Sequence, residues 1–203
     1  MKVLLERIYW MTRSPDRALL CIALIVPCFL LSEMSYAQRV TAANIDKSSI
    51  TFVGKQMNVP TDGKFGKFAL QIVFDPAKLQ ESRIQMDVEL ASIDTGSVEA
   101  NDEVKGKSWF DVKNNPTARF VSTAIKSLGG NRYEVTGKMT IKGRTRDVTA
   151  PFTFKPEGQG GTFEGAFTLK RLDYAIGEGP WADTDTVANE VQVKFRISGT
   201  SGR

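Results

Sequence analysis

The chain has 203 residues, with 27 lysines and arginines against 23 aspartates and glutamates, two cysteines and no histidine. Its net charge of +4 is too small a bias to predict nucleic-acid binding. The lack of histidine excludes serine-histidine and cysteine-histidine catalysis, and with them ordinary zinc sites built from histidine and cysteine.

The first 37 residues have the layout of a secretory signal peptide. Four basic residues between positions 2 and 17 precede the apolar run Ala18–Leu31, and the small-x-small triplet Ser35-Tyr36-Ala37 follows it. The run is shorter than the roughly 20 residues that a membrane-spanning helix needs. We therefore expect a signal peptide over residues 1–37, cleaved after Ala37, with Met1 and Met11 as alternative starts.

The remaining residues, 38–203, are long enough for one domain with a hydrophobic core. Both cysteines, Cys21 and Cys28, lie in the expected signal peptide, so the exported chain forms no disulfide. Its basic and acidic residues number 23 and 20, which leaves a net charge of +3.

Alternation of apolar and polar residues is the dominant pattern after the signal peptide, and a period of two predicts half-buried strands. One segment breaks the rhythm, Ser97–Lys107, where Ser97 is placed to cap a short helix. The pattern predicts eight strands, in chain order Ser49–Gly54, Phe68–Phe74, Arg83–Leu90, Ala118–Ile125, Tyr133–Ile141, Val148–Phe154, Phe163–Leu169 and Val191–Ile197.

Glycine-rich turns separate the later strands and predict an antiparallel meander. Examples are Gly129-Gly130-Asn131 and Lys142-Gly143-Arg144. Eight strands that each have one apolar face can close into a barrel or pack as a two-sheet sandwich, and a meander favours the barrel. Such a barrel is just wide enough to be filled by its own side chains or to hold one slender ligand.

The stretch 169–186, LKRLDYAIGEGPWADTDT, concentrates acidic residues near its end. Asp183 and Asp185 allow the hypothesis of a carboxylate-based enzyme, but alternate residues on a short loop do not make an opposed glycosidase pair. A calcium loop fails, since Lys194 stands where the final glutamate is needed. We interpret the acids as turn formers, and expect Arg171 and Asp173 to share a face and to pair with each other or with a neighbouring strand.

Several short motifs together resemble the YceI-like family. They stand in its order and spacing over nearly all of the exported chain: Phe52–Met57, Ala91–Gly96, Trp109–Val112, Ala118–Thr123, Gly137–Gly143, Leu172–Gly177 and Trp181–Thr184. The wider family often has a histidine where this chain has Gln56, and an Arg-Asp-x-His-Leu run where it has Asn101–Val104.

The resemblance implies an all-β, eight-stranded antiparallel, lipocalin-like barrel with one short helix. It also implies export to the bacterial periplasm and an apolar interior that binds a polyisoprenoid, an isoprenoid quinone or another long-chain amphiphile. No catalytic residue, metal or cofactor is implied. Expected partners are the lipid and a membrane protein or membrane surface for delivery, with no nucleic acid; the oligomeric state stays open, a homodimer included.

Large side chains on the inward faces are the candidates for the ligand-binding lining, and each buried CH₂ of a tail would contribute about 0.8 kcal/mol. Met57, Trp109 and Trp181 are candidate mouth residues, and Lys55 and Lys142 are among the basic residues placed to meet a charged head group. The lining candidates are Phe52, Phe68, Ile72, Phe74, Ile84, Met86, Val88, Phe120, Tyr133, Val135, Met139, Ile141, Phe152, Phe154, Phe163, Phe167, Tyr174 and Phe195.

A second function class is compatible with the same alternation. The barrel could be filled by its own side chains and act as a periplasmic stress or interaction protein that binds a protein partner on its surface. The two hypotheses differ in one structural respect, since only the lipid-binding hypothesis requires a cavity.

Overall fold

A computed structural model of the chain describes residues 39–201. The expected signal peptide, residues 1–37, lies outside the described residues and stays a prediction. No helix in the described part of the chain is long and apolar enough to cross a membrane.

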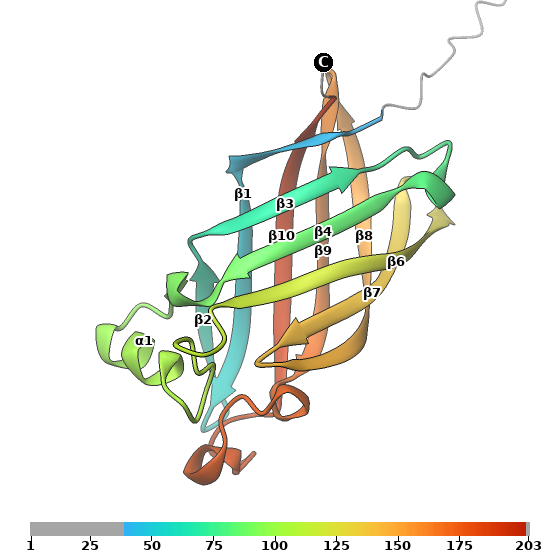
Figure 1. The fold of residues 1–203 in the computed structure, drawn as a ribbon. Helices are drawn as coiled ribbons and strands as arrows, with labels where there is room; N and C mark the ends of the chain where they lie inside the picture. Colours follow the sequence, from blue (N-terminus) through green and yellow to red (C-terminus); the bar gives the residue numbers. More distant parts are fainter. Residues whose placement is uncertain (1–38, 202–203) are drawn as a thin grey trace, which may run out of the picture. The chain divides into compact units, whose positions relative to one another are not determined.

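Ten strands and one α-helix make up the described residues, with four short 3₁₀ helices between them (Figure 1). In chain order they are β1 (Ala42–Gln56), β2 (Val59–Phe65), β3 (Phe68–Val73), η1 (Leu79–Glu81), β4 (Arg83–Glu89), η2 (Leu90–Ser92), β5 (Ile93–Asp94), α1 (Val98–Lys105), β6 (Thr117–Gly129), β7 (Arg132–Ile141), β8 (Arg144–Glu157), β9 (Gly160–Lys170), η3 (Arg171–Tyr174), η4 (Gly179–Ala182) and β10 (Glu190–Thr200).

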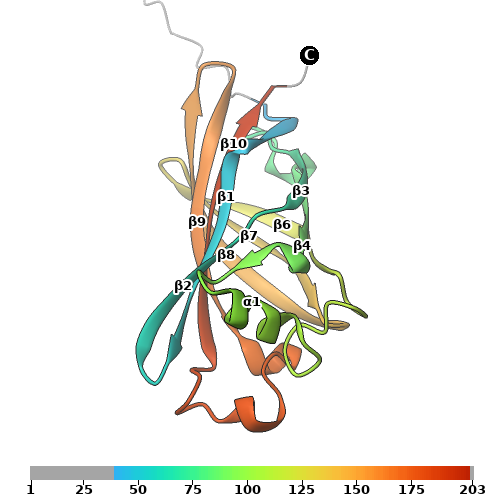
Figure 2. The ribbon, with the colours of Figure 1, turned by 90° about the vertical axis from the view of Figure 1, so that its left-hand side faces the viewer.

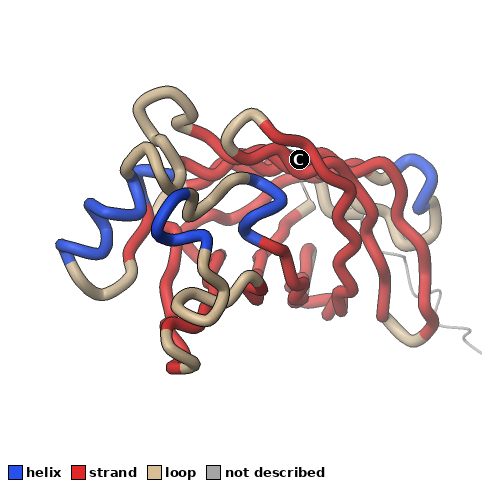
Figure 3. Tube along the Cα trace, turned by 90° about the horizontal axis from the view of Figure 1, so that it is seen from below, coloured by secondary structure: helices blue, strands red, loops and turns tan. Residues whose placement is uncertain are grey.

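All ten strands form one antiparallel sheet in the order β3-β4-β6-β7-β8-β9-β10-β1-β2-β5. Figure 3 shows the sheet bent around an interior. The order does not return to β3, so the sheet is an open, barrel-like structure rather than a closed barrel. A single bridge between Val40 and Phe74 links the segment before β1 to the end of β3. The all-β prediction is confirmed, and the predicted count of eight strands is corrected to ten.

The two strands that the sequence pattern misses are β2 and β5. β2 contains Pro60, Asp62 and Gly63, residue types that are rare in strands, and it has no clear alternation. It forms because the tight turn at Met57 and Asn58 folds it back onto β1. β5 has only two residues, too few to show a period. Figure 2 shows the β1–β2 hairpin extending beyond the neighbouring strands.

The predicted meander and helix are both confirmed. Strands β6 to β10 are neighbours in chain order, and the turns between them use residues with positive φ such as Asn131 and Lys142. Helix α1 begins after Ser97, whose hydroxyl accepts a hydrogen bond from the Ala100 amide at 3.3 Å. This is the N-cap that the sequence predicts.

Buried side chains gather in two clusters toward opposite ends of the sheet. One contains Val40 and an aromatic cluster of five rings, Phe74, Tyr133, Phe152, Phe154 and Phe163. The other contains Leu90, Ala118, Ile141, Tyr174 and Ile176, with Trp109 and Phe110 packed against it. Because β9 begins near Phe163 and ends just before Arg171, the two ends lie about 26 Å apart along this strand.

Candidate functional site

A cavity of about 650 Å³ lies between the two clusters. Its wall is built by side chains two positions apart on each strand, for example Ile84, Met86 and Val88 of β4. Alternation places these residues on one face of the sheet, and the bend of the sheet turns that face inward. The volume falls in the range of roughly 300–1,000 Å³ that small-molecule sites occupy.

Thirteen of the eighteen lining candidates lie on the wall of this cavity. They come from β1, β3, β4, β6, β7, β8, β9 and β10. They are Phe52, Ile72, Ile84, Met86, Val88, Phe120, Val135, Met139, Ile141, Phe152, Phe163, Phe167 and Phe195.

The other five candidates are packed in the core rather than on the cavity wall. Phe74, Tyr133 and Phe154 belong to the aromatic cluster, and Phe68, in edge strand β3, packs against the same core. Tyr174 lies in η3, where the chain has left the sheet, and burial raises its pKa to about 12. The period of two predicts the face of the sheet but not the position along it, so it cannot separate wall from core.

Sequence reasoning missed other wall residues. Val191 and Val193 continue the inward alternation of Phe195 on β10 and could have been found by the same rule. No such signal exists for Phe65 of the unrecognised β2, or for Phe110, which follows α1.

Glycines on neighbouring strands let phenylalanine rings lie along the wall instead of across the cavity. Phe52 of β1 is paired with Gly63 of β2, and a Cβ on Gly63 would overlap the Phe52 ring. Phe195 of β10 is paired with Gly165 of β9, and a Cβ on Gly165 would overlap the Phe195 ring. The space between the strands therefore depends on residues that have no side chain.

We expect Gly63→Ala to reduce the open volume of the cavity. The three nearest atoms to the new Cβ all belong to the Phe52 ring, so the ring must move toward the interior, at a cost of about 1–3 kcal/mol. Binding of the apolar dye phenylnaphthylamine should weaken about tenfold. The double variant Gly63→Ala/Phe52→Leu should recover dye binding because the smaller side chain clears the Cβ. Unchanged dye affinity in the single variant would contradict this account.

The cavity reaches the surface at the end that contains α1. Among its wall residues only five are largely exposed to solvent, and we call them the mouth: Lys55, Gln56, Thr61, Glu99 and Glu103. They come from the end of β1, from β2 and from α1, which lie at the same end of the sheet (Figure 1).

Two of the three predicted mouth residues lie on the cavity wall. The indole N–H of Trp181 donates a hydrogen bond of 2.9 Å to Glu103 of α1, and the rings of Trp181 and Trp109 are 5.5 Å apart between centroids. These contacts join the loop after η3 to α1 across the end of the cavity. Met57 is not a wall residue; it lies at the tip of the β1–β2 hairpin and is 72% exposed.

Arg171 organises the segment that closes this end. Its side chain is 2% exposed, and all five of its N–H groups donate to backbone carbonyls at 2.7–3.1 Å. The acceptors are the carbonyls of Ile176, Gly177, Trp181, Val187 and Ala188. A single side chain thus holds the loop between β9 and β10 from within.

Backbone carbonyl groups, and not a carboxylate, surround the positive charge of Arg171. Burial lowers the pKa of the guanidinium, and five carbonyl dipoles take the place of water. Gly177, at φ 78°, permits the guanidinium of Arg171 to approach the backbone closely, since a Cβ on Gly177 would overlap this group. The expected pairing of Arg171 with Asp173 is wrong, because the strand ends at Lys170 and in η3 Arg171 is buried whereas Asp173 is exposed.

Asp183 of this loop acts as a turn former, as predicted. Asp183 accepts hydrogen bonds from the Asp185 amide at 3.0 Å and from the Thr186 hydroxyl at 2.8 Å. The Thr186 bond is the largest cause of the lowered pKa of Asp183. In the described residues no group of three or more histidine, cysteine, aspartate or glutamate side chains is placed to hold a metal ion.

The two basic candidates for a head group differ in availability. The ammonium of Lys142 donates to the carbonyls of Lys107 and Ala175 and to Glu178, at 2.7–2.9 Å. The hydrogen bond from Lys142 is the largest cause of the lowered pKa of Glu178. Lys142 is therefore committed to the loop, whereas Lys55 lies at the mouth.

The sequence of residues 42–199 matches the family model for the YceI-like domain. The chain belongs to the YceI-like family. Among curated relatives, a UPF0312 protein of Pseudomonas putida strain W619 is 36% identical over 138 residues, which cover 65% of this chain and 71% of that protein. A UPF0312 protein of Azotobacter vinelandii is 30% identical over 143 residues, covering 68% and 72%.

Two solved structures are similar in fold to this chain. The crystal structure of Burkholderia cenocepacia BcnA superposes with a TM-score of 0.75 at 49% identity and covers 78% of this chain and 99% of BcnA. A polyisoprenoid binding domain from Saccharophagus degradans has a TM-score of 0.62 at 15% identity, covering 82% and 99%. At that identity the second likeness supports the fold alone.

Proposed function

We propose that this YceI-like protein is exported to the bacterial periplasm, where it sequesters or carries a long-chain amphiphile inside its cavity. The proposed ligand is a polyisoprenoid, an isoprenoid quinone or another lipid with a slender apolar tail. We propose no catalysis and no cofactor. Delivery would take place at a membrane surface or a membrane protein.

One observation carries this proposal, the uneven distribution of polarity along the cavity wall. The polar and charged wall residues are Lys55, Gln56, Thr61, Thr95, Glu99, Glu103 and Arg171, and all of them lie at or next to the mouth. From there to the aromatic cluster the wall is apolar. An amphiphile is likewise divided into a polar head and an apolar tail. Its head would lie at the polar mouth and its tail along the apolar wall.

The energetics favour a long tail over a compact polar ligand. Each CH₂ moved from water to an apolar wall contributes about 0.8 kcal/mol, without any specific contact. All five N–H groups of Arg171 are already used, so this buried cation offers a ligand no hydrogen bond. Family membership supports the proposal, and a polyisoprenoid binding domain from Saccharophagus degradans shares this fold.

The alternative of an interaction protein with a filled interior loses its structural basis, because the interior contains a cavity. The alternative of a carboxylate enzyme is weakened by the bonds of Asp183, whose two carboxylate oxygens both accept hydrogen bonds within its own loop.

The decisive test is to isolate the protein from the periplasm of several hosts, extract it with organic solvent and analyse the extract by mass spectrometry. We expect an amphiphile in stoichiometric amount, and we expect the same compound, returned to extracted protein, to raise the unfolding midpoint. A ligand at 100 times its Kd stabilises by about 2.7 kcal/mol. The proposal fails if every extract is empty and no added prenol or fatty acid changes the unfolding midpoint.

A further inference from the structure

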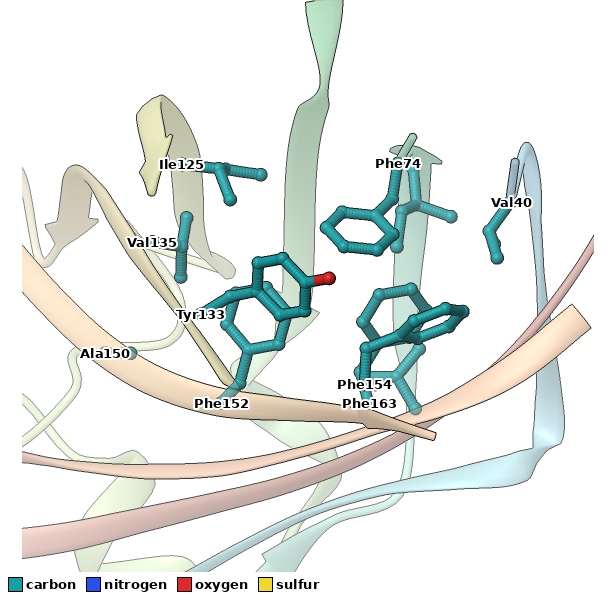
Figure 4. Close-up of a cluster of buried hydrophobic side chains, with 11 residues drawn as sticks. Val40, Phe74, Ile125, Tyr133, Val135, Ala150, Phe152, Phe154 and Phe163 are labelled. Atoms are coloured by element: carbon teal, nitrogen blue, oxygen red, sulfur yellow. The ribbon is translucent and has the colours of Figure 1, made fainter. Parts of the chain in front are cut away.

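The end of the cavity opposite the mouth is closed by the aromatic cluster, shown in Figure 4. The ring of Phe74 contacts the other four rings of the cluster, with centroid separations between 5.0 and 6.0 Å. Only Phe152 and Phe163 face the cavity, and Phe74, Tyr133 and Phe154 lie behind them. The cavity therefore ends against a layer of rings two deep.

This layer is fixed by the backbone as well as by packing. Val40 and Phe74 exchange two hydrogen bonds of 2.8 Å, and both residues have no exposed surface. Phe154 and Phe163 are register partners on β8 and β9, and their rings are 4.7 Å apart between centroids. Closely packed side chains of this kind cannot move aside without opening a void, so the end of the cavity is rigid.

A rigid end opposite a polar mouth limits what the cavity can hold. Phe163 near the start of β9 and Arg171 just after its end are separated by eight residues, about 26 Å along the strand. A tail whose head group stays at the mouth can extend only this far before it meets Phe152 and Phe163. Further carbons would have to fold back or remain in water.

We propose that the aromatic cluster, through Phe152 and Phe163, sets the maximum tail length of the amphiphile that this protein accepts. The inference rests on the proposed function, because it assumes that a tail enters the cavity. It assigns Phe163 a role in specificity that is distinct from the general apolar character of the wall.

The test is a binding series of all-trans prenols that grow by one isoprene unit at a time from geraniol to solanesol, measured by competition against a fluorescent fatty-acid analogue. In the wild-type protein, affinity should rise about tenfold or more with each isoprene unit until the tail reaches the cluster, and then stop rising. In Phe163→Ala the plateau should move to a longer prenol. If the alanine variant does not fold, Phe163→Leu can replace it. This substitution removes less volume and should shift the plateau in the same direction.

Phe167→Ala is the matched control, since Phe167 lies on the same strand and the same wall but nearer the mouth. It should lower affinity for all the prenols and leave the plateau where it is. The length limit is overturned if the plateau stays in place in both Phe163 variants, or if affinity rises without a plateau in the wild-type protein. Failure of every prenol and of the fatty-acid analogue to bind would instead overturn the proposed function.

Discussion

Replacement of Arg171 by alanine should destabilise the protein by about 3–5 kcal/mol, because it leaves buried carbonyl groups without hydrogen-bond donors. The five carbonyls of Ile176, Gly177, Trp181, Val187 and Ala188 would lose their donors. An unbonded buried carbonyl is costly, so the loop between β9 and β10 should detach. Thermal unfolding should show a midpoint lower by about 10 °C or more, and hydrogen exchange should show the loss of protection in residues 171–189.

Two further variants serve as controls, one that keeps the charge of Arg171 and one that removes an exposed arginine. Arg171→Lys keeps the charge but has three donors on a flexible stem, so it should recover only part of the loss. Arg196→Ala removes an exposed arginine that bonds Glu164 on the surface, and it should cost less than about 1 kcal/mol. If Arg171→Ala unfolds at the wild-type midpoint with unchanged loop protection, Arg171 does not hold the loop.

Filling the cavity from its side wall should weaken ligand binding strongly without unfolding the protein. Ala150 lies on β8 opposite Val135 of β7, and both residues line the cavity. In Ala150→Phe the new ring would occupy space that a tail needs. Displacing about three CH₂ groups of the tail costs roughly 2.4 kcal/mol, which corresponds to a loss of affinity of about 60-fold. Prenol competition and the ligand-dependent rise in the unfolding midpoint measure the effect.

The adjacent Thr149 provides the matched control, because it is exposed on the outer face of the same strand. Thr149→Phe adds the same ring outside the cavity and should leave prenol affinity unchanged. The unliganded Ala150→Phe protein should remain folded, with a stability within about 2 kcal/mol of the wild type. Wild-type affinity in Ala150→Phe would place the ligand somewhere other than this cavity.

Local patterns in the sequence were enough to determine the all-β class, the meander and the inward face of most strands. A period of two depends only on neighbouring residues, so Ile84, Met86 and Val88 could be assigned to the interior without knowledge of the sheet. The cap at Ser97 and the turn at Asp183 were also predictable, because each uses bonds within a few residues. Strand β2 was not predictable from local patterns, since it depends on its pairing with β1.

Only the tertiary structure decided which inward residues form a cavity and which fill an end. Phe74 and Phe163 have the same inward phase in the sequence and both belong to the aromatic cluster, yet only Phe163 also faces the cavity. Arg171 also continues the inward alternation of Phe167 and Leu169, but its partners lie 5–17 residues away and reach it only when the loop reverses direction. Alternation is a local property, whereas the end of a cavity and the partners of a buried charge are set by segments that meet only in the folded sheet.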